Sequence, residues 1–165
     1  MYMHVCMVIS LNLKDNQWEV CNYKNEKKIK LEKVELNNSV NIYNCENTNF
    51  TIENPKFKSL QIQKCGKCNI VLNNLISSIE IIDCKKIKIQ VLGKCSSISI
   101  DKCIGVEIYL SKENTESEFT TALSSEMNVH FEKNGEWKEL TIPEQYQHTL
   151  CGGKLNTRVS DLYNY

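Results

Sequence analysis

The sequence holds a single arginine, Arg158, among its 20 basic residues, and 20 acidic residues balance these to a formal net charge of zero. Recognition of guanine and of phosphate backbones relies largely on the planar guanidinium group, which lysine does not replace. A chain without net positive charge is not drawn as a whole to nucleic acid or to an acidic membrane surface. We therefore expect no nucleic acid and no membrane among its partners.

The sequence also lacks the motifs of common catalytic and cofactor sites. There is no G-x-S-x-G, no Walker A and no G-x-G-x-x-G sequence. Cys65 and Cys68 form one C-x-x-C, but no second one stands at the spacing of a zinc site. His4, His130 and His148 have no cysteine or carboxylate at a ligand spacing. We expect no enzymatic activity, no cofactor and no metal ion.

A targeting signal is absent as well. Residues 1–13 are mildly apolar, but they lack a basic segment and a small-residue cleavage site, and they are too short to span a bilayer. We interpret residues 1–16 as an N-terminal extension that contains at most a first strand. The expected location is the cytoplasm.

What the sequence does contain is a repeat. The order apolar-x-Ile-x-x-Cys occurs four times, with copies 20, 19 and 19 residues apart, at residues 40–45, 60–65, 79–84 and 98–103. Apolar residues follow each cysteine by five and seven positions: Phe50 and Ile52, Ile70 and Leu72, Ile89 and Val91, Ile108 and Leu110. Four of the nine cysteines thus recur at one point of the repeat, which indicates packing residues rather than a disulfide framework.

Each repeat therefore holds two short strands with two-residue alternation, plus a third inward position at Phe57, Ile76 and Cys95. Such units bury their apolar faces only by stacking as coils. We predict an all-β fold, a right-handed parallel β-helix of about five or six coils. Its register predicts two outward ladders, which run through Asn41, Gln61, Glu80 and Ser99 and through Thr51, Val71, Lys88 and Glu107.

The C-terminal part differs from the repeat. After Leu110 the period is expected to end, and Asn134-Gly135 predicts a hairpin between a strand that ends near Phe131 and a returning strand at 137–142. Gly152-Gly153 precedes one more alternating strand, at 155–159. The prediction is therefore a β-helix followed by antiparallel strands.

With these repeats in place, the sequence resembles the C-terminal domain of cyclase-associated protein, an actin monomer-binding β-helix, over about residues 17–162. The resemblance lies in N-Q-W-E-V at 16–20, S-V-N-I-Y-N-C at 39–45, I-Q-V-L-G-K at 89–94, I-S-I-D-K at 98–102, Y-L-S-K at 109–112, S-S-E-M-N-V at 124–129, I-P-E-Q-Y at 142–146 and G-K-L-N-T-R-V at 153–159. It implies coils over about 17–123 and dimerisation strands with a tail over about 124–162.

The resemblance also implies a function. The family's domain is a dimer that exchanges C-terminal strands, binds monomeric actin with a preference for the ADP form, and promotes nucleotide exchange. The actin contacts that this implies here are Lys112, Glu113, Ser124, Ser125, Glu126, Asn128, Lys154, Asn156 and Arg158. The implied dimerisation residues are Met127, Val129, Phe131, Trp137, Leu140, Ile142, Leu155 and Val159.

Two alternatives remain open at this point. A scaffold of the same fold would bind and sequester the actin monomer without promoting exchange, and the sequence barely separates it from an exchange factor. The related tubulin-folding cofactor C accelerates GTP hydrolysis with an arginine on the face of its β-helix. The coils of this chain contain no arginine, which disfavours that second function.

Overall fold

The structure is a computed structural model of the chain, and it describes residues 9–114 and 116–161. The first eight residues of the expected extension, His4 among them, lie outside the described residues, and so does Leu162 at the end of the expected domain. In the described part of the chain, no helix has the length and apolarity needed to cross a membrane.

Two seven-stranded sheets make up most of the fold. The first contains, in order, β1 (Ser10–Lys14), β2 (Gln17–Cys21), β4 (Ser39–Tyr43), β7 (Ser59–Gln63), β10 (Ser78–Ile82), β12 (Ser97–Asp101) and β14 (Glu118–Ala122). The second contains β3 (Ile29–Leu31), β5 (Asn49–Ile52), β8 (Asn69–Leu72), β11 (Lys85–Val91), β13 (Ile104–Leu110), β15 (Ser125–Lys133) and β16 (Glu136–Thr141). A small third sheet pairs β6 (Lys56–Phe57) with β9 (Asn74–Leu75).

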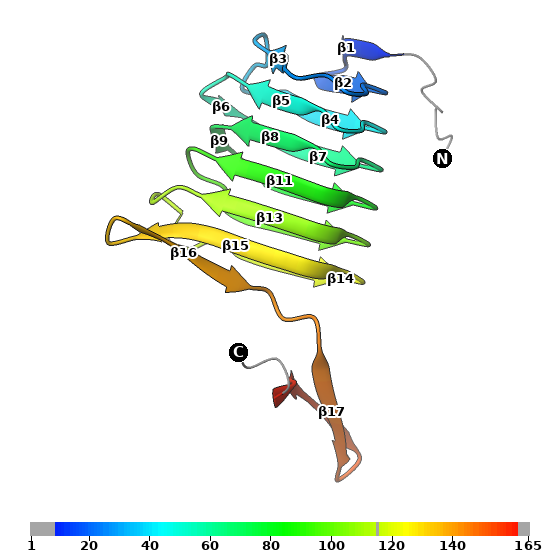
Figure 1. Cartoon of the computed structure of the whole chain (residues 1–165), viewed down its shortest axis with the longest axis vertical. Coiled ribbons are helices and arrows are strands. Elements are labelled where there is room, and N and C mark those ends of the chain that lie inside the picture. Colours follow the sequence, from blue (N-terminus) through cyan, green and yellow to red (C-terminus); the bar gives the residue numbers. More distant parts are fainter. Residues whose placement is uncertain (1–8, 115, 162–165) are drawn as a thin grey trace.

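The chain runs along the first sheet, turns, and returns along the second, so that successive coils stack on one another (Figure 1). Strands β2, β4, β7, β10, β12 and β14 pair in parallel and mark six coils. The predicted parallel β-helix is therefore confirmed. At its N-terminal end, β1 pairs antiparallel with β2, so residues 10–14 of the expected extension form an edge strand of the first sheet.

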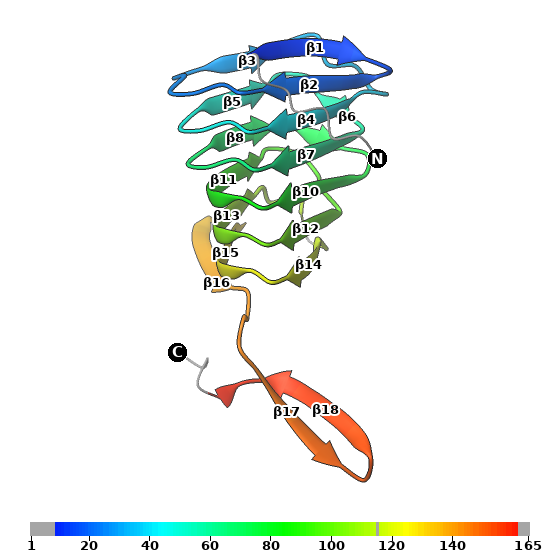
Figure 2. The same cartoon turned by 90° about the vertical axis from the view of Figure 1, so that its right-hand side faces the viewer.

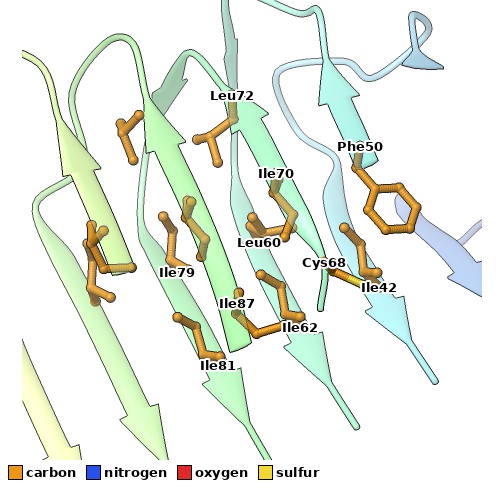
Figure 3. Close-up of a cluster of buried hydrophobic side chains, with 14 of the residues drawn as sticks. Ile42, Phe50, Leu60, Ile62, Cys68, Ile70, Leu72, Ile79, Ile81 and Ile87 are labelled. Carbon is orange, nitrogen blue, oxygen red and sulfur yellow. The ribbon is translucent and has the colours of Figure 1, made fainter. Parts of the chain in front are cut away.

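The core lies between the two sheets and is filled by the alternating apolar residues of the repeat. In β7, Leu60 and Ile62 are buried while the residues beside them are only half-buried, and β4, β10 and β12 repeat this arrangement. The buried side chains form a continuous column along the axis of the β-helix (Figure 3). Because full burial of one such side chain contributes roughly 1.5–3 kcal/mol, the column is the main source of stability.

The corner cysteines stack along one side of this core. The backbone N–H of Cys45 donates to Sγ of Cys65, and that of Cys65 donates to Sγ of Cys84, both at 3.4 Å. The neighbouring thiols and burial raise the pKa of Cys65, so it stays protonated. Seven of the eight described cysteines are buried, and Cys151 is the exposed one. The interpretation of the repeated cysteines as packing residues is confirmed.

Two details of the predicted register are wrong. Ile76 was expected to point inward, but it is 50% exposed, and Leu75 fills the position because β9 pairs it with Phe57. The second outward ladder also differs. Val71 lies beside Gln90, and Lys88 lies beside Asn69, although the expected pair of Lys88 and Glu107 is present. The first ladder, through Asn41, Gln61, Glu80 and Ser99, is confirmed.

The prediction that the repeat ends after Leu110 is also wrong. One further coil follows, in which β14 pairs in parallel with β12, and β15 with β13. The repeat motif is altered in this coil. Phe119 and Thr121 take the positions that Ile98 and Ile100 hold in the coil before, and Ser124 takes the place of the corner cysteine. The Ser124 Oγ accepts the backbone N–H of Cys103 at 3.0 Å.

The C-terminal strands leave the β-helix in two steps. Strand β16 returns antiparallel to β15 through Asn134 and Gly135, which both have positive φ, as a tight hairpin turn requires. The chain then forms a separate hairpin of β17 (Tyr146–Cys151) and β18 (Lys154–Val159), which extends away from the coils (Figures 1 and 2). Strand β18 was predicted, whereas β17 was not.

Candidate interaction surfaces

The hairpin of β17 and β18 presents two different faces. All twelve residues of its strands are exposed. Because side chains alternate along a strand, Lys154, Asn156 and Arg158 share one face, together with Gln147 and Thr149 of β17. On this polar face the Arg158 guanidinium donates to Gln147 Oε1 at 2.8 Å and to Asp161 at 2.9 Å. Three of the expected actin contacts are thus brought together.

The opposite face of the hairpin is mostly apolar. Leu150 and Leu155 lie directly opposite each other, and so do Tyr146 and Val159. The two leucines are 75% and 66% exposed. An isolated two-stranded hairpin is marginally stable in water, and an uncovered apolar face of this kind usually marks a contact. We define these four residues as the apolar hairpin face.

The last coil of the β-helix also leaves apolar surface uncovered. Leu140 of β16 faces the same side as Val129, yet it is 62% exposed, because β16 is the edge strand of its sheet. Among the expected dimerisation residues, Trp137, Leu140, Leu155 and Val159 are exposed, whereas Phe131 and Ile142 pack partly against the core. Met127 and Val129 are buried in the core of the chain itself.

The segment from Ser124 to Asn128 forms the last corner and the start of β15. Glu126 is exposed, and its backbone N–H donates to the Glu144 carboxylate at 2.7 Å. Asn128 lies on the outer face, where its Oδ1 accepts the hydroxyl of Thr141 at 2.9 Å. Ser124 has a structural role at the corner, because its Oγ also donates to the carbonyl of Ala122.

Lys112 and Glu113 are not beside that corner. They are exposed in the turn after β13, whereas Ser125 stands next to Ile104 at the start of the same strand. Seven residues of extended strand place the two groups about 20 Å apart. The expected actin contacts therefore fall on three separate places: the polar hairpin face, the last corner and the turn after β13.

A further cluster lies on the outer face of the second sheet, which the sequence did not single out. The Glu107 carboxylate accepts the Tyr109 hydroxyl at 2.6 Å and lies 3.2 Å from Lys88 Nζ. The Tyr109 ring stacks on His130 at 4.2 Å, and its edge meets Trp137 at 6.1 Å. The sequence did not indicate this cluster because His130 has no interaction partner near it in the sequence. Its partners lie one coil earlier.

The hydrogen bond between Tyr109 and Glu107 has opposite effects on their two pKa values. It lowers the pKa of the Glu107 carboxyl and raises the pKa of Tyr109 to about 12. His130 Nε2 lies 3.8 Å from the same carboxylate and is buried without a hydrogen-bond partner among the described residues. The cluster therefore holds Glu107 ionised and gives the outer face a rigid aromatic patch.

We expect Tyr109→Phe to lower the free energy of unfolding at pH 7 by about 1 kcal/mol, because it removes one hydrogen bond to a charged acceptor. A carboxyl with a lowered pKa stabilises the fold above its ordinary pKa and loses that contribution as the pH falls through the lowered value. The difference between variant and parent should therefore shrink on acidification. Denaturant unfolding at a series of pH values measures it, and a difference independent of pH would contradict the assignment.

In the residues that the structure describes, no group of three or more histidine, cysteine, aspartate or glutamate side chains is placed to hold a metal ion. The surfaces described above are open faces rather than enclosed sites. Their chemistry suits contact with another macromolecule.

Comparison with known proteins gives a consistent result. The family described as "Adenylate cyclase associated (CAP) C terminal" matches residues 8–162. The chain is 38% identical over 148 residues to the adenylyl cyclase-associated protein of Dictyostelium discoideum, covering 88% of this chain and 32% of that protein. It is 37% identical over 153 residues to adenylyl cyclase-associated protein 1 of Homo sapiens, covering 92% and 32%.

A solved structure is similar over nearly the same range. The crystal structure of cyclase-associated protein from Cryptosporidium parvum superposes with a TM-score of 0.85 at 36% identity, covering 93% of this chain and 96% of that one. The chain spans about a third of the length of the curated relatives it matches.

Proposed function

This chain belongs to the family of adenylate cyclase-associated protein C-terminal domains, and from that membership we propose that it binds monomeric actin. The bound monomer is preferentially the ADP form, and binding promotes exchange of its nucleotide, so that the protein recycles monomers during filament turnover in the cytoplasm. The family is not enzymatic, in agreement with the expectation from the sequence.

The observation that carries this proposal is the extent of the family match, which runs from the first strand through both C-terminal hairpins. The geometry supports it with an exposed polar surface on a projecting element. Lys154, Asn156 and Arg158 on one hairpin face offer amide and cationic donors to a partner, and Glu126 offers a carboxylate at the last corner. Exposed polar groups of this kind fix orientation and specificity at an interface.

We also propose that the chain acts as a homodimer in which the hairpins exchange. The apolar hairpin face and the exposed Leu140 at the end of the β-helix are two uncovered apolar surfaces of one molecule. A two-fold dimer would cover both at once, because each protomer supplies the surface that the other needs. The polar hairpin face, with Arg158, would then remain available to actin.

Release of a fluorescent ATP analogue from actin monomers, chased with excess ATP, tests the exchange activity. We expect this protein to accelerate the release to a plateau as its concentration rises. Slowed release would instead identify a protein that sequesters the monomer. Unchanged release, with no complex in a parallel sedimentation run, would contradict the proposal.

Charge reversal then tests the contact residues. Glu126→Lys and Arg158→Glu should each weaken actin binding by about tenfold, the effect of one lost charged contact. The last corner tolerates lysine, since Lys67 and Lys86 hold the same position in earlier coils. Glu32→Lys, at an exposed position after β3, is the matched control. A lowered melting temperature in the two variants would show a structural role instead.

A further inference from the structure

The turns that join the first sheet to the second form one straight edge of the β-helix, on the right in Figure 1. Each turn contains two residues with positive φ that are three positions apart. From the first coil to the last, these pairs are Asn22 and Asn25, Asn44 and Asn47, Lys64 and Lys67, Asp83 and Lys86, Lys102 and Gly105, and Leu123 and Glu126. We call this edge the corner edge.

In the first two coils, asparagine suits this conformation. Asparagine tolerates positive φ better than other residues with a side chain, apart from aspartate. It also forms ladders between coils here. Asn44 Nδ2 donates to Asn22 Oδ1 at 2.6 Å, and Asn47 Nδ2 donates to Asn25 Oδ1 at 2.9 Å.

In the third to fifth coils, lysine replaces asparagine without gaining either advantage. Lys64, Lys67, Lys86 and Lys102 all have positive φ, and a lysine side chain has no acceptor with which to continue the ladder. Lys67 and Lys86 hold equivalent positions in adjacent coils, where like charges repel. Lys64 gains one contact, since its Nζ lies 5.8 Å from the centroid of the Tyr43 ring. Residues that depart from the preference of a turn with so little structural gain indicate a function.

The positive charge of this section is only partly compensated. Lys85 is a fifth lysine in this section, and it lies beside Gly66 in the register. The carboxylates near these lysines are those of Asp83 and Glu46. The side chain of Glu46 lies against Gly66. Within the described part of the chain, none of the five lysines forms an ion pair within 4.0 Å. A hollow of about 460 Å³ lies between Lys64, Lys67, Lys85 and Lys86.

The corner edge carries exposed apolar residues directly beyond these lysines. Leu123 follows Lys102 in the stack and is 81% exposed, with a φ of 49° that is rare for leucine. Ile104 lies next to Lys85 in the register and is 45% exposed. Basic residues beside protruding apolar side chains are the combination found in proteins that attach to the surface of anionic membranes.

We propose that the corner edge docks on an anionic membrane surface, with the lysines against lipid phosphates and with Leu123 and Ile104 entering the interface. A straight edge can bring all five lysines to a plane at the same time. An acidic protein suits the edge less well, because protein interfaces are rich in tryptophan, tyrosine and arginine and depleted in lysine. The zero net charge does not prevent this, since salt screens charges beyond about 8 Å.

Co-sedimentation with vesicles tests the proposal. The unaltered chain should bind vesicles that contain phosphatidylserine and a phosphoinositide, should not bind phosphatidylcholine vesicles, and should lose affinity as salt rises. Replacing Lys64, Lys67, Lys86 and Lys102 by asparagine should weaken binding by at least about a hundredfold. The melting temperature should stay the same or rise, because asparagine is the residue that the same turns use in the first two coils.

The matched control replaces Lys33, Lys56, Lys58 and Lys94, which are exposed away from the corner edge, by asparagine. It removes the same charge and should keep most of the binding. Leu123→Asn should weaken vesicle binding even at raised salt. The proposal is overturned if the unaltered chain binds no vesicle, if the edge and control variants lose equal affinity, or if the edge variant loses only its affinity for actin, which would make the edge a protein interface.

Discussion

A chain that carries both Leu150→Asp and Leu155→Asp is expected to sediment as a monomer of 19.1 kDa, whereas the unaltered chain is expected to sediment at twice that mass. The two leucines lie opposite each other at the end of the apolar hairpin face that is nearest the turn. In the proposed dimer they are covered by the other protomer, so each aspartate would place an unpaired charge in an apolar contact. Such burial costs several kcal/mol, and the dissociation constant should rise by about a thousandfold.

The hairpin itself supplies the control. Thr149 and Asn156 form the neighbouring pair on the polar face, so Thr149→Asp with Asn156→Asp adds the same charge one pair further from the turn. This variant should remain dimeric. Sedimentation velocity over a range of concentrations distinguishes the cases. A monomeric unaltered chain at micromolar concentration would refute the exchanged dimer, and the apolar hairpin face would then need another partner.

Replacement of Ile81 by alanine should lower the free energy of unfolding by about 4 kcal/mol. Ile81 lies at the centre of the column of core side chains, with no exposed surface. Removal of its outer carbons both loses transfer free energy and leaves a cavity, because stacked coils on either side prevent collapse of the site. The melting temperature should fall by about 10 °C. Thermal and denaturant unfolding at one fixed protein concentration measure both quantities.

The residue pair Leu75 and Ile76 provides the matched control for this effect. Leu75→Ala should cost about 3 kcal/mol because Leu75 is buried, whereas Ile76→Ala should change stability by less than about 0.5 kcal/mol. The two residues are adjacent and both apolar, so hydrophobicity alone does not separate them. The opposite ranking would mean that the inward position belongs to Ile76, as the repeat had predicted.

The stacked architecture could be predicted because its signal repeats within the sequence itself. Two-residue alternation in Leu60 and Ile62 specifies strands, and the recurrence of the same pattern after 19 or 20 residues specifies coils of nearly equal length. Corner cysteines at constant spacing specify a stack. These three features depend only on neighbouring residues and on the length of one repeat. None of them requires knowledge of how distant strands pair.

The candidate surfaces could be predicted from the sequence only in part. The two faces of the C-terminal hairpin depend on the pairing of Leu150 with Leu155. The sequence did not predict β17, because its apolar residues do not alternate regularly. The contacts of His130 with Tyr109 and Glu107 cross from one coil to the next, over 21 and 23 positions. A coil one or two residues longer would place other side chains together.

The sequence by itself determined the β-helix, the inward residues of the two main strands in the regular coils, the family and the absence of net charge. Only the tertiary structure decided which outward residues are neighbours. Coil lengths vary through turns of different length, so the register is set by backbone hydrogen bonds between strands that are far apart in the sequence. That register exposes Ile76, gathers the lysines on the corner edge, and separates the polar from the apolar face of the projecting hairpin.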